Sequence, residues 1–403
     1  MDKLSVRDLD VRGKRVLMRV DYNVPLADGK VTDDTRIRAT LPTIELLLKQ
    51  GARLILMSHL GRPKGPGGAE AGLSLAPVAS RLSELLGRPV AFATDCVGES
   101  VEQLASALAP GEVLLLENLR FHPEEEANDP GFASALARLC DVYVNDAFGA
   151  AHRAHASIVG VTAHLKPAAA GLLLARELEV LGQALAAPQR PFVAILGGAK
   201  ISGKMDLITH LLPRVDHLLI GGAMMFTLLR AKGIATGRSL VEEDRIEMAR
   251  EILARAGKKL VLPDDCRVAP SPDASGAPGT VVAIDAIPPG QFGVDIGPAT
   301  VARFAAVLGD ARTVLWNGPM GIFEVPAFAP GTRAVAGLVA EATERGAMTI
   351  VGGGDSVAAV EEAGLASRIS HLSTGGGASL EFLEGRTLPG VAALTDAPAR
   401  APR

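Results

Sequence analysis

Residues 192–205 read FVAILGGAKISGKM, and this stretch holds the pattern that decides the fold. An apolar run, residues 192–196, stops abruptly at Gly197 and Gly198. A short apolar run that ends in a turn signal is typical of a strand buried on both faces of a parallel sheet. Glycine lets backbone N–H groups approach a phosphate, and a helix that follows adds its positive N-terminal end. The stretch therefore predicts a parallel strand followed by an anion-binding turn.

The same arrangement recurs along the chain. Helical spacing of apolar residues occurs in residues 35–50, 75–86 and 242–256, and a glycine follows each segment, as expected for a left-handed helix end. Alternation of strands and helices indicates an α/β fold with doubly wound, Rossmann-like parallel sheets. The predicted strands are residues 15–20, 53–57, 113–116, 142–144, 192–196, 217–220, 259–262, 313–316, 348–351 and 371–372.

Chain length indicates two domains, because 403 residues exceed one ordinary hydrophobic core. Residues 168–185 are apolar on more than one face and predict a long helix between the halves. We therefore expect a first domain over residues 1–170, a linking helix over 171–187 and a second domain over 188–383.

Composition excludes several functional classes. The net charge of −4 gives no global field that would attract nucleic acid or an anionic membrane. No stretch reaches the ~18 apolar residues of a membrane span, and the first ten residues carry charges where a signal peptide needs an apolar run. Cys96, Cys140 and Cys266 lie far apart, without metal-ligand or disulfide spacing, and are expected to be reduced and buried. These features predict a soluble cytoplasmic protein without nucleic-acid or membrane partners.

The second half carries glycine clusters and two lysines. Residues 198–204 match GxxxxGK, but Met205 stands where a P-loop needs Ser or Thr, so the P-loop interpretation is disfavoured. Lys200 and Lys204 would share one face if the run were helical; two solvated surface lysines are the alternative. Residues 352–354 and 375–377 are two more glycine clusters at strand ends, and Asp355 adds an oxygen ligand that Mg²⁺ could use.

The first half is instead rich in arginine and histidine at the strand ends. Singly, these residues could be turn formers, solvated charges or a packed histidine. Together, planar guanidinium groups suit a small substrate that carries both carboxylate and phosphate. The candidates are Asp21, Asn23, Arg36, His59, Arg62, Arg120 and Arg153. The chain has no GxSxG, HExxH or CxxC motif, and no GxGxxG followed by the acidic residue that a dinucleotide oxidoreductase needs.

Eight motifs in order make the chain resemble the phosphoglycerate kinase family from about Leu9 to Leu394. They are RVDYNVP (19–25), SHLGRP (58–63), LLENLRFH (115–122), NDAFG (145–149), LGGAKISGK (196–204), WNGPMGIFE (316–324), GGGDS (352–356) and STGGGAS (373–379).

The resemblance implies reversible, Mg²⁺-dependent transfer of a phosphoryl group from 1,3-bisphosphoglycerate to ADP, which gives 3-phosphoglycerate and ATP in glycolysis or gluconeogenesis. It assigns the seven first-half candidates to the phosphoglycerate. It assigns Arg36, Lys200 and the amides of Gly354, Gly375, Gly376 and Gly377 to the moving phosphoryl. The nucleotide residues would be Lys204, Gly293, Asn317, Glu324, Gly353, Gly354, Asp355 and Ser356, with Asp355 also near Mg²⁺.

The resemblance further implies that the C-terminal segment, residues 384–403, completes the first domain. Because the two candidate edges lie on separate sheets, we also expect hinge bending that brings the two substrates together. The sequence shows no obvious interface patch, which favours a monomer. The residue inventory suits this chemistry, because phosphoryl transfer needs alignment and charge stabilisation, and a carboxylate acceptor needs no general base. Two alternatives are another small-molecule carboxylate kinase and a phosphate- or nucleotide-binding regulatory protein. The second would be expected to lack Lys200, Lys204 or Asp355, and all three are present.

Overall fold

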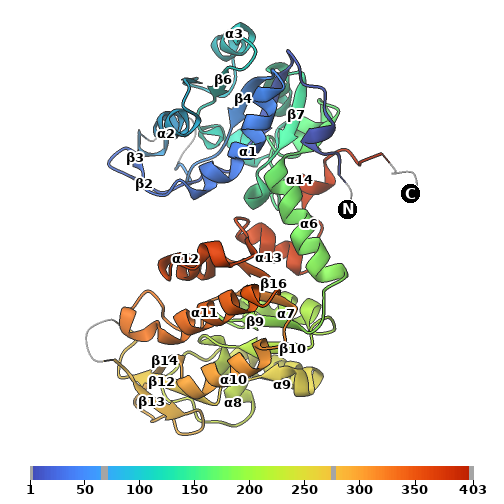
Figure 1. Ribbon diagram of the computed structural model, residues 1–403. Helices are drawn as coiled ribbons and strands as arrows, with labels where there is room; N and C mark the ends of the chain where they lie inside the picture. The colour runs from blue at the N-terminus through green and yellow to red at the C-terminus, as the bar shows by residue number, and fades with distance from the viewer. Residues whose placement is uncertain (1–2, 65–70, 274–277, 399–403) are drawn as a thin grey trace. The chain divides into compact units, whose positions relative to one another are not determined.

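The computed structural model describes residues 3–64, 71–273 and 278–398 (Figure 1). The chain divides into two compact units. The first comprises Met1–Glu179 with Thr387–Arg403, and the second comprises Val180–Arg386. Of the predicted C-terminal segment, residues 399–403 lie outside the described part. No helix among the described residues is both long enough and apolar enough to cross a membrane.

The first unit is built on a parallel sheet that has six strands within the described residues. Its order is β5 (Val90–Phe92), β6 (Val113–Leu115), β4 (Arg53–Met57), β1 (Arg15–Arg19), β7 (Val142–Asn145) and β8 (Ala168–Ala170). Its main helices are α1 (Thr35–Lys49), α2 (Ala76–Leu86), α3 (Glu99–Ala107), α4 (Pro123–Glu126), α5 (Pro130–Arg138) and α14 (Pro389–Ala392). The buried strand side chains of β1 and β4, such as Val16, Met18 and Leu54, pack in one core with Ile37 and Ile44 of α1.

Register brings the polar strand ends of this sheet together. Arg19, the last residue of β1, lies opposite Met57 of β4 on one side and Asn145 of β7 on the other. The segments that follow these strands therefore leave the sheet at one edge. Ligands of open parallel sheets bind beyond the carboxyl ends of the strands, so this edge is the place to look for a site.

The C-terminal segment returns to the first unit. The Leu4 amide donates to the Thr395 carbonyl at 2.9 Å, and the Thr395 amide donates to the Ala168 carbonyl at 2.9 Å. Lys3 forms an ion pair with Asp396 at 2.6 Å. These contacts join residues 3–4 to residues 395–396 beside β8.

The start of the linking helix differs from the sequence prediction. Residues 168–170 form strand β8, which pairs with β7, and α6 covers Leu172–Ala186. The helix begins there because a side chain caps it: Asp146 Oδ1 accepts from the amides of Leu173 (2.9 Å) and Leu174 (3.1 Å). Periodicity could not separate three alanines in a strand from the helix that follows, because a short apolar run has no distinguishing period.

The second unit is built on the sheet β11 (Leu260–Val261), β10 (His217–Ile220), β9 (Phe192–Leu196), β15 (Thr313–Asn317), β16 (Met348–Gly352) and β17 (His371–Leu372). All its neighbouring strands are parallel. Numbered along the chain within this sheet, the order is 3-2-1-4-5-6, the doubly wound order that binds nucleotides where the direction of strand addition reverses. That point lies between β9 and β15, where Asn317 is opposite Leu196.

Helices cover this second sheet: α7 (Met205–Leu211), α8 (Met224–Ala231), α9 (Ile246–Ala256), α10 (Pro298–Leu308), α11 (Pro330–Glu344), α12 (Gly354–Glu362) and α13 (Gly377–Leu383). Helices α8 and α9 pack together, as do α10 and α11 (Figure 1). The two parallel sheets with helices confirm the predicted α/β, Rossmann-like fold class.

An antiparallel sheet of β13 (Thr280–Ala283), β12 (Asp265–Ala269) and β14 (Phe292–Ile296) also belongs to the second unit, and the sequence analysis did not predict it. A small hairpin of β2 (Leu26–Ala27) and β3 (Lys30–Val31) in the first unit was likewise missed. β13 is largely exposed and β14 carries Asp295 among its apolar residues, so neither gives the continuous apolar run of a parallel strand.

Candidate active site

Asp21 and Asn23 follow β1 and are tied to the neighbouring segments. Asp21 Oδ2 accepts from Arg36 Nη1 at 3.1 Å, and the same nitrogen donates to the Asn23 carbonyl at 3.2 Å. Asn23 Oδ1 accepts from the Gly61 amide at 2.8 Å. The structure therefore brings Arg36, from the first turn of α1, to the segment after β1, as predicted for residues at one sheet edge.

His59 follows β4 and is only 3% exposed. Its Nδ1 lies 3.1 Å from Arg19 Nη2, and its Nε2 lies 3.3 Å from Arg153 Nη1. Burial lowers the pKa of His59 well below its usual value, and the charges of Arg19, Arg120, Arg153 and Arg36 lower it further. The imidazole is therefore neutral, and it can take part in binding as a hydrogen-bonding group but not as a cation.

Three of the predicted arginines line one cavity. Arg62, Arg120 and Arg153 surround a volume of about 650 Å³, together with His122 and His155. Burial is the main reason that the pKa values of Arg120 and Arg153 are lowered, and repulsion from neighbouring guanidinium groups lowers them further. Glu126, which also lines the cavity and lies 2.8 Å from Arg120, opposes the shift of Arg120, and Asp21 opposes that of Arg153. Arginine still remains protonated. An anion in this cavity would offset the repulsion, which suits a ligand with a phosphate or carboxylate group.

Arg19 belongs beside this set, although the sequence analysis assigned it no role in the site. Its side chain is fully buried, and its Nε donates to Ser157 Oγ at 2.9 Å. Ser157 in turn donates to Glu125 Oε1 at 2.5 Å, and burial raises the pKa of Glu125. The signal in the sequence was an arginine inside the apolar run at residues 16–20, because a charged side chain is almost never fully buried unless it has partners.

In the second unit, Lys204 reaches the switch point of the sheet. Its Nζ donates to Asn317 Oδ1, and Asn317 Nδ2 donates to the Gly352 carbonyl at 2.9 Å. Burial lowers the pKa of Lys204, and Glu384 and Asp355 oppose that shift. The structure therefore brings Lys204, Asn317 and Asp355 together.

Lys200 does not share a helical face with Lys204. The 3₁₀ turn Ser202–Lys204 begins after Lys200, so the condition for a common face, a continuous helix, is not met. Lys200 is exposed, and its charge acts on Glu242, whose carboxylate accepts from the Ser202 amide at 3.1 Å. Gly198, two residues before Lys200, has φ = 106°, a conformation that favours glycine and does not belong to a helix.

The glycine cluster after β16 begins a helix, as predicted. Gly353 has φ = 91°, a conformation that favours glycine, and it precedes α12. Ser356 Oγ, in the first turn of α12, accepts from the Gly318 amide at 2.6 Å and so ties this turn to the end of β15. The cluster 375–377 similarly precedes α13, with Gly376 at φ = 50°. In the second of these turns the Gly375 amide donates to Ser373 Oγ at 3.3 Å. Both turns place the first amides of a helix beside a strand end.

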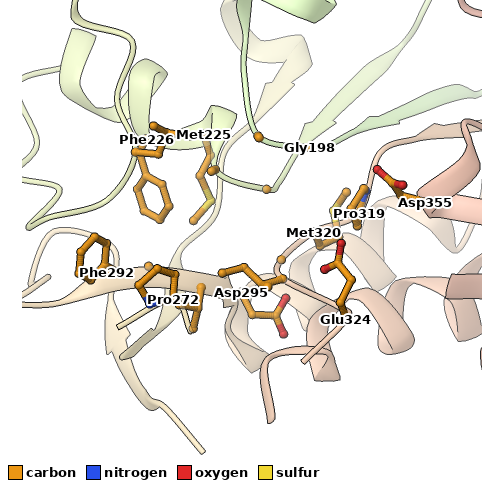
Figure 2. A pocket seen from close by; sticks show the side chains of 18 of the residues that line it. Gly198, Met225, Phe226, Pro272, Phe292, Asp295, Pro319, Met320, Glu324 and Asp355 are labelled. Atoms are coloured by element: carbon orange, nitrogen blue, oxygen red, sulfur yellow. The ribbon is translucent and has the colours of Figure 1, made fainter. Parts of the chain in front are cut away.

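A cavity of about 520 Å³ lies at the same edge (Figure 2). Phe226 and Phe292 lie at one end of it, and the carboxylates of Glu324 and Asp355 lie at the other. Arg238 stacks over the Phe292 ring at 4.7 Å from the ring centre. The cavity thus has an apolar end and a polar end, as a nucleotide requires, with the base among apolar groups and the phosphates near the glycine turns. No sequence pattern indicated Phe226, Phe292 or Arg238 as site residues, because the antiparallel sheet that presents Phe292 was not predicted.

Gly293 and Asp295 of β14 also line this cavity. A Cβ atom at Gly293 would lie 2.0 Å from Phe226 Cζ, so the ring packs directly on the glycine backbone. Asp295 is 1% exposed, and burial raises its pKa to about 7. Asp295 Oδ2 accepts from the Gly331 amide at 2.6 Å and so anchors the first turn of α11.

The model of the phosphoglycerate kinase family matches residues 6–386 of this sequence. The chain belongs to the phosphoglycerate kinase family. It is 62% identical over 399 residues to phosphoglycerate kinase of Moorella thermoacetica, with 98% of this chain and 100% of the relative covered. It is 58% identical over 400 residues to phosphoglycerate kinase of Chlorobium limicola, with the same two coverages.

Solved structures of the family agree in fold. Phosphoglycerate kinase from Coxiella burnetii matches with a TM-score of 0.87 and 43% identity, over 97% of this chain and 98% of that one. The protein from Pyrococcus horikoshii matches with a TM-score of 0.85 and 34% identity, over the same shares. Membership in the phosphoglycerate kinase family makes the chain an enzyme, a phosphotransferase whose acceptor is a carboxyl group.

Proposed function

We propose that the enzyme catalyses the reversible, Mg²⁺-dependent transfer of a phosphoryl group from 1,3-bisphosphoglycerate to ADP, giving 3-phosphoglycerate and ATP. The first unit holds the phosphoglycerate and the second holds the nucleotide. The observation that carries this division is the contrast between two cavities. One is lined by Arg62, Arg120 and Arg153, and the other has an apolar end and a carboxylate end at the switch point of a doubly wound sheet.

The phosphoglycerate is held by charge and by planar donors. Arg62, Arg120 and Arg153 offer forked N–H groups to its phosphate. Asp21 and Asn23 accept a hydrogen bond from the substrate hydroxyl or position Arg36. Arg36 Nη1 lies 3.1 Å from Asp21 Oδ2 before any ligand binds. His59, held neutral by burial, contributes a hydrogen bond.

The nucleotide is held by backbone as much as by side chains. Its base lies between α8 and β14, where Gly293 leaves room for Phe226. Its phosphates meet Lys204 and the turn from Gly353 to Ser356, with Asn317 holding the Lys204 ammonium in place. Glu324 lines the polar end of the cavity and accepts from the ribose hydroxyls.

The residues at the polar end fit a magnesium ion. Asp355 is exposed in the first turn of α12, and its carboxylate lies on the cavity wall, where it offers the hard oxygen donor that Mg²⁺ prefers. Mg²⁺ binds largely through substrate phosphates and water, so one carboxylate suffices. When bound, the ion neutralises charge on the nucleotide phosphates.

The protein's own residues supply alignment and charge. The acceptor carboxylate is already ionised, so no general base is required. Charge on the moving phosphoryl is stabilised by Arg36, by Lys200 and by the amides of Gly354 and of Gly375, Gly376 and Gly377. Arg36 belongs to the first unit and the others to the second, so transfer requires both units.

A coupled assay tests the reaction. The protein is given 3-phosphoglycerate, ATP and Mg²⁺, and a dehydrogenase that reduces the acyl phosphate product reports turnover through NADH consumption. We expect turnover that needs 3-phosphoglycerate and is lost on chelation of Mg²⁺. Turnover with another small carboxylate but not with 3-phosphoglycerate would favour the alternative carboxylate kinase, and nucleotide binding without turnover would favour a regulatory protein.

Ligands that belong to separate units make hinge bending part of the proposal. In-line transfer needs reacting atoms within about 3–3.5 Å and water excluded. One ligand alone contacts one unit and has little differential affinity for a closed state, whereas both together bridge the units. The ends of α6 and the segment 323–331 are the candidate hinges. Small-angle scattering should show a radius of gyration that shrinks clearly only with 3-phosphoglycerate and a non-hydrolysable Mg-nucleotide together; an unchanged radius would refute closure.

The proposal also includes a monomer in the cytoplasm, where both substrates of a glycolytic enzyme occur. Light scattering coupled to size exclusion should give the mass of one 41.7 kDa chain. The mass of a stable dimer would contradict the proposed monomer, but it would not contradict the proposed reaction.

A further inference from the structure

Asp95, Cys96 and His122 form a cluster of three different donor side chains in the first unit. Asp95 and Cys96 follow β5, and His122 follows the 3₁₀ turn Leu119–Phe121, so two separate segments meet here. One ligand atom from each residue lies within 4.8 Å of the other two. His122 Nε2 and Asp95 Oδ1 are 2.6 Å apart.

The donor chemistry selects a class of ion. Thiolate and imidazole are the ligands of borderline and soft cations such as Zn²⁺ and Cd²⁺, and a carboxylate completes many such sites. Mg²⁺ prefers an all-oxygen shell and would not compete. Three protein ligands leave one tetrahedral position for water.

The three side chains are held in place before any ion arrives. The His122 ring stacks on Phe132 at 5.0 Å between ring centres. Asp95 Oδ1 accepts from the Cys96 amide at 2.6 Å, and Cys96 Sγ donates to the Glu117 carbonyl at 3.0 Å. A site that is already ordered loses little conformational entropy on binding.

An ion can reach the cluster from one side. Cys96 is fully buried, but the side chains of Asp95 and His122 are 50% and 27% exposed, so an ion can approach from their side. Burial raises the pKa of Cys96 well above its usual value, and the carboxylates of Asp95, Glu125 and Glu117 raise it further, so an ion must displace the thiol proton in order to bind.

We propose that Asp95, Cys96 and His122 form a binding site for Zn²⁺ or Cd²⁺, distinct from the Mg²⁺ position at Asp355. Binding forms bonds from the ion to Oδ1, Sγ and Nε2. The thiol proton is released to solvent, and the proton that His122 Nε2 shares with Asp95 passes to Nδ1 through solvent, so one proton is released per ion. His122 also lines the arginine cavity, so the ion lies beside the proposed phosphoglycerate site.

A cadmium titration of the full-length protein tests the site, because a thiolate bound to Cd²⁺ gives an ultraviolet charge-transfer band. We expect saturation at one Cd²⁺ per chain, displacement by Zn²⁺ and no displacement by excess Mg²⁺. Loss of an outer-shell partner typically costs about 10-fold to 100-fold in affinity, so loss of a direct ligand should cost at least ~10-fold. Cys96→Ser should abolish the band, and His122→Gln should weaken binding at least ~10-fold.

Cys140→Ser is the matched control, since Cys140 is also buried and free but belongs to no such cluster among the described residues. Its band should match that of the wild type. A band that persists in Cys96→Ser, disappears in Cys140→Ser, or keeps its wild-type affinity in His122→Gln would overturn the proposal. Circular dichroism shows whether each variant is folded. If Cys96→Ser does not fold, the Cd²⁺ affinity of His122→Gln alone decides whether the cluster binds the ion.

Discussion

Replacement of Gly293 by alanine should damage nucleotide binding and leave the phosphoglycerate site intact. The new Cβ would lie 2.0 Å from Phe226 Cζ, and an ordinary carbon contact needs about 3.4 Å. The ring must therefore move by roughly 1.4 Å, and because Phe226 is 1% exposed and packed in α8, its free direction is the cavity that it lines. Such overpacking costs about 1–3 kcal/mol.

If the overpacking destabilises only the complex with ADP, ADP affinity drops by about 5-fold to 150-fold, since 1.4 kcal/mol corresponds to a factor of ten. Titration calorimetry measures the dissociation constant for ADP. The coupled assay measures the Michaelis constant for the phosphoglycerate substrate, which should not change. Phe226→Leu in the Gly293→Ala background should restore part of the ADP affinity, because the smaller side chain removes the overlap.

Gly337→Ala is the matched control. Gly337 lies within α11, and a Cβ there meets nothing within 4 Å. This change should leave ADP affinity unchanged and stabilise the helix by up to about 1 kcal/mol. Wild-type ADP affinity in Gly293→Ala would refute the assignment of this end of the cavity to the nucleotide.

Three further predictions concern the catalytic groups and the capping carboxylate. Arg36→Lys keeps the charge but loses the planar fork, so kcat should fall on the order of 10²-fold while ADP affinity, measured by calorimetry, stays the same; near-full kcat would exclude the proposed role. Lys204→Ala should mainly weaken ADP binding and Lys200→Ala should mainly lower kcat, and equal effects on both parameters would remove the distinction. Burial raises the pKa of Asp146 to about 6 from 3.8, so its contribution to stability is greatest below about pH 4 and decreases by up to about 3 kcal/mol as pH rises through 6. Asp146→Asn should flatten that part of the pH dependence in denaturant unfolding, and an unchanged profile in the variant would contradict it.

Apart from β5 and β8, the parallel strands and their polar ends could be predicted from the sequence, because each is a short apolar run followed by an abrupt turn signal. Asp21 and His59, which follow predicted strands, could therefore be placed at one sheet edge from the sequence alone, whereas Arg36 reaches that edge from the first turn of α1. The register of β1 with β4 and β7 then explains why these segments meet.

What the sequence could not supply depends on contacts that are distant along the chain. The antiparallel strand β14 has no clear period, and the cavity wall of Phe292 and Arg238 depends on it. The separation of Lys200 from Lys204 follows from a non-helical backbone that periodicity does not encode. The role of Arg19 depends on Ser157, which lies 138 positions later in the sequence.

The central claim is that each unit binds one substrate, and crossed binding measurements on two variants test it most directly. Titration calorimetry would measure the affinities for phosphoglycerate and for Mg-ADP in the wild type, in Arg153→Gln and in Lys204→Ala. Arg153→Gln should weaken phosphoglycerate binding and leave Mg-ADP binding within about twofold, because Arg153 lines the arginine cavity; Lys204→Ala should do the reverse. If either variant weakened both ligands equally, or weakened the wrong one, the division of the two substrates between the two units would be wrong.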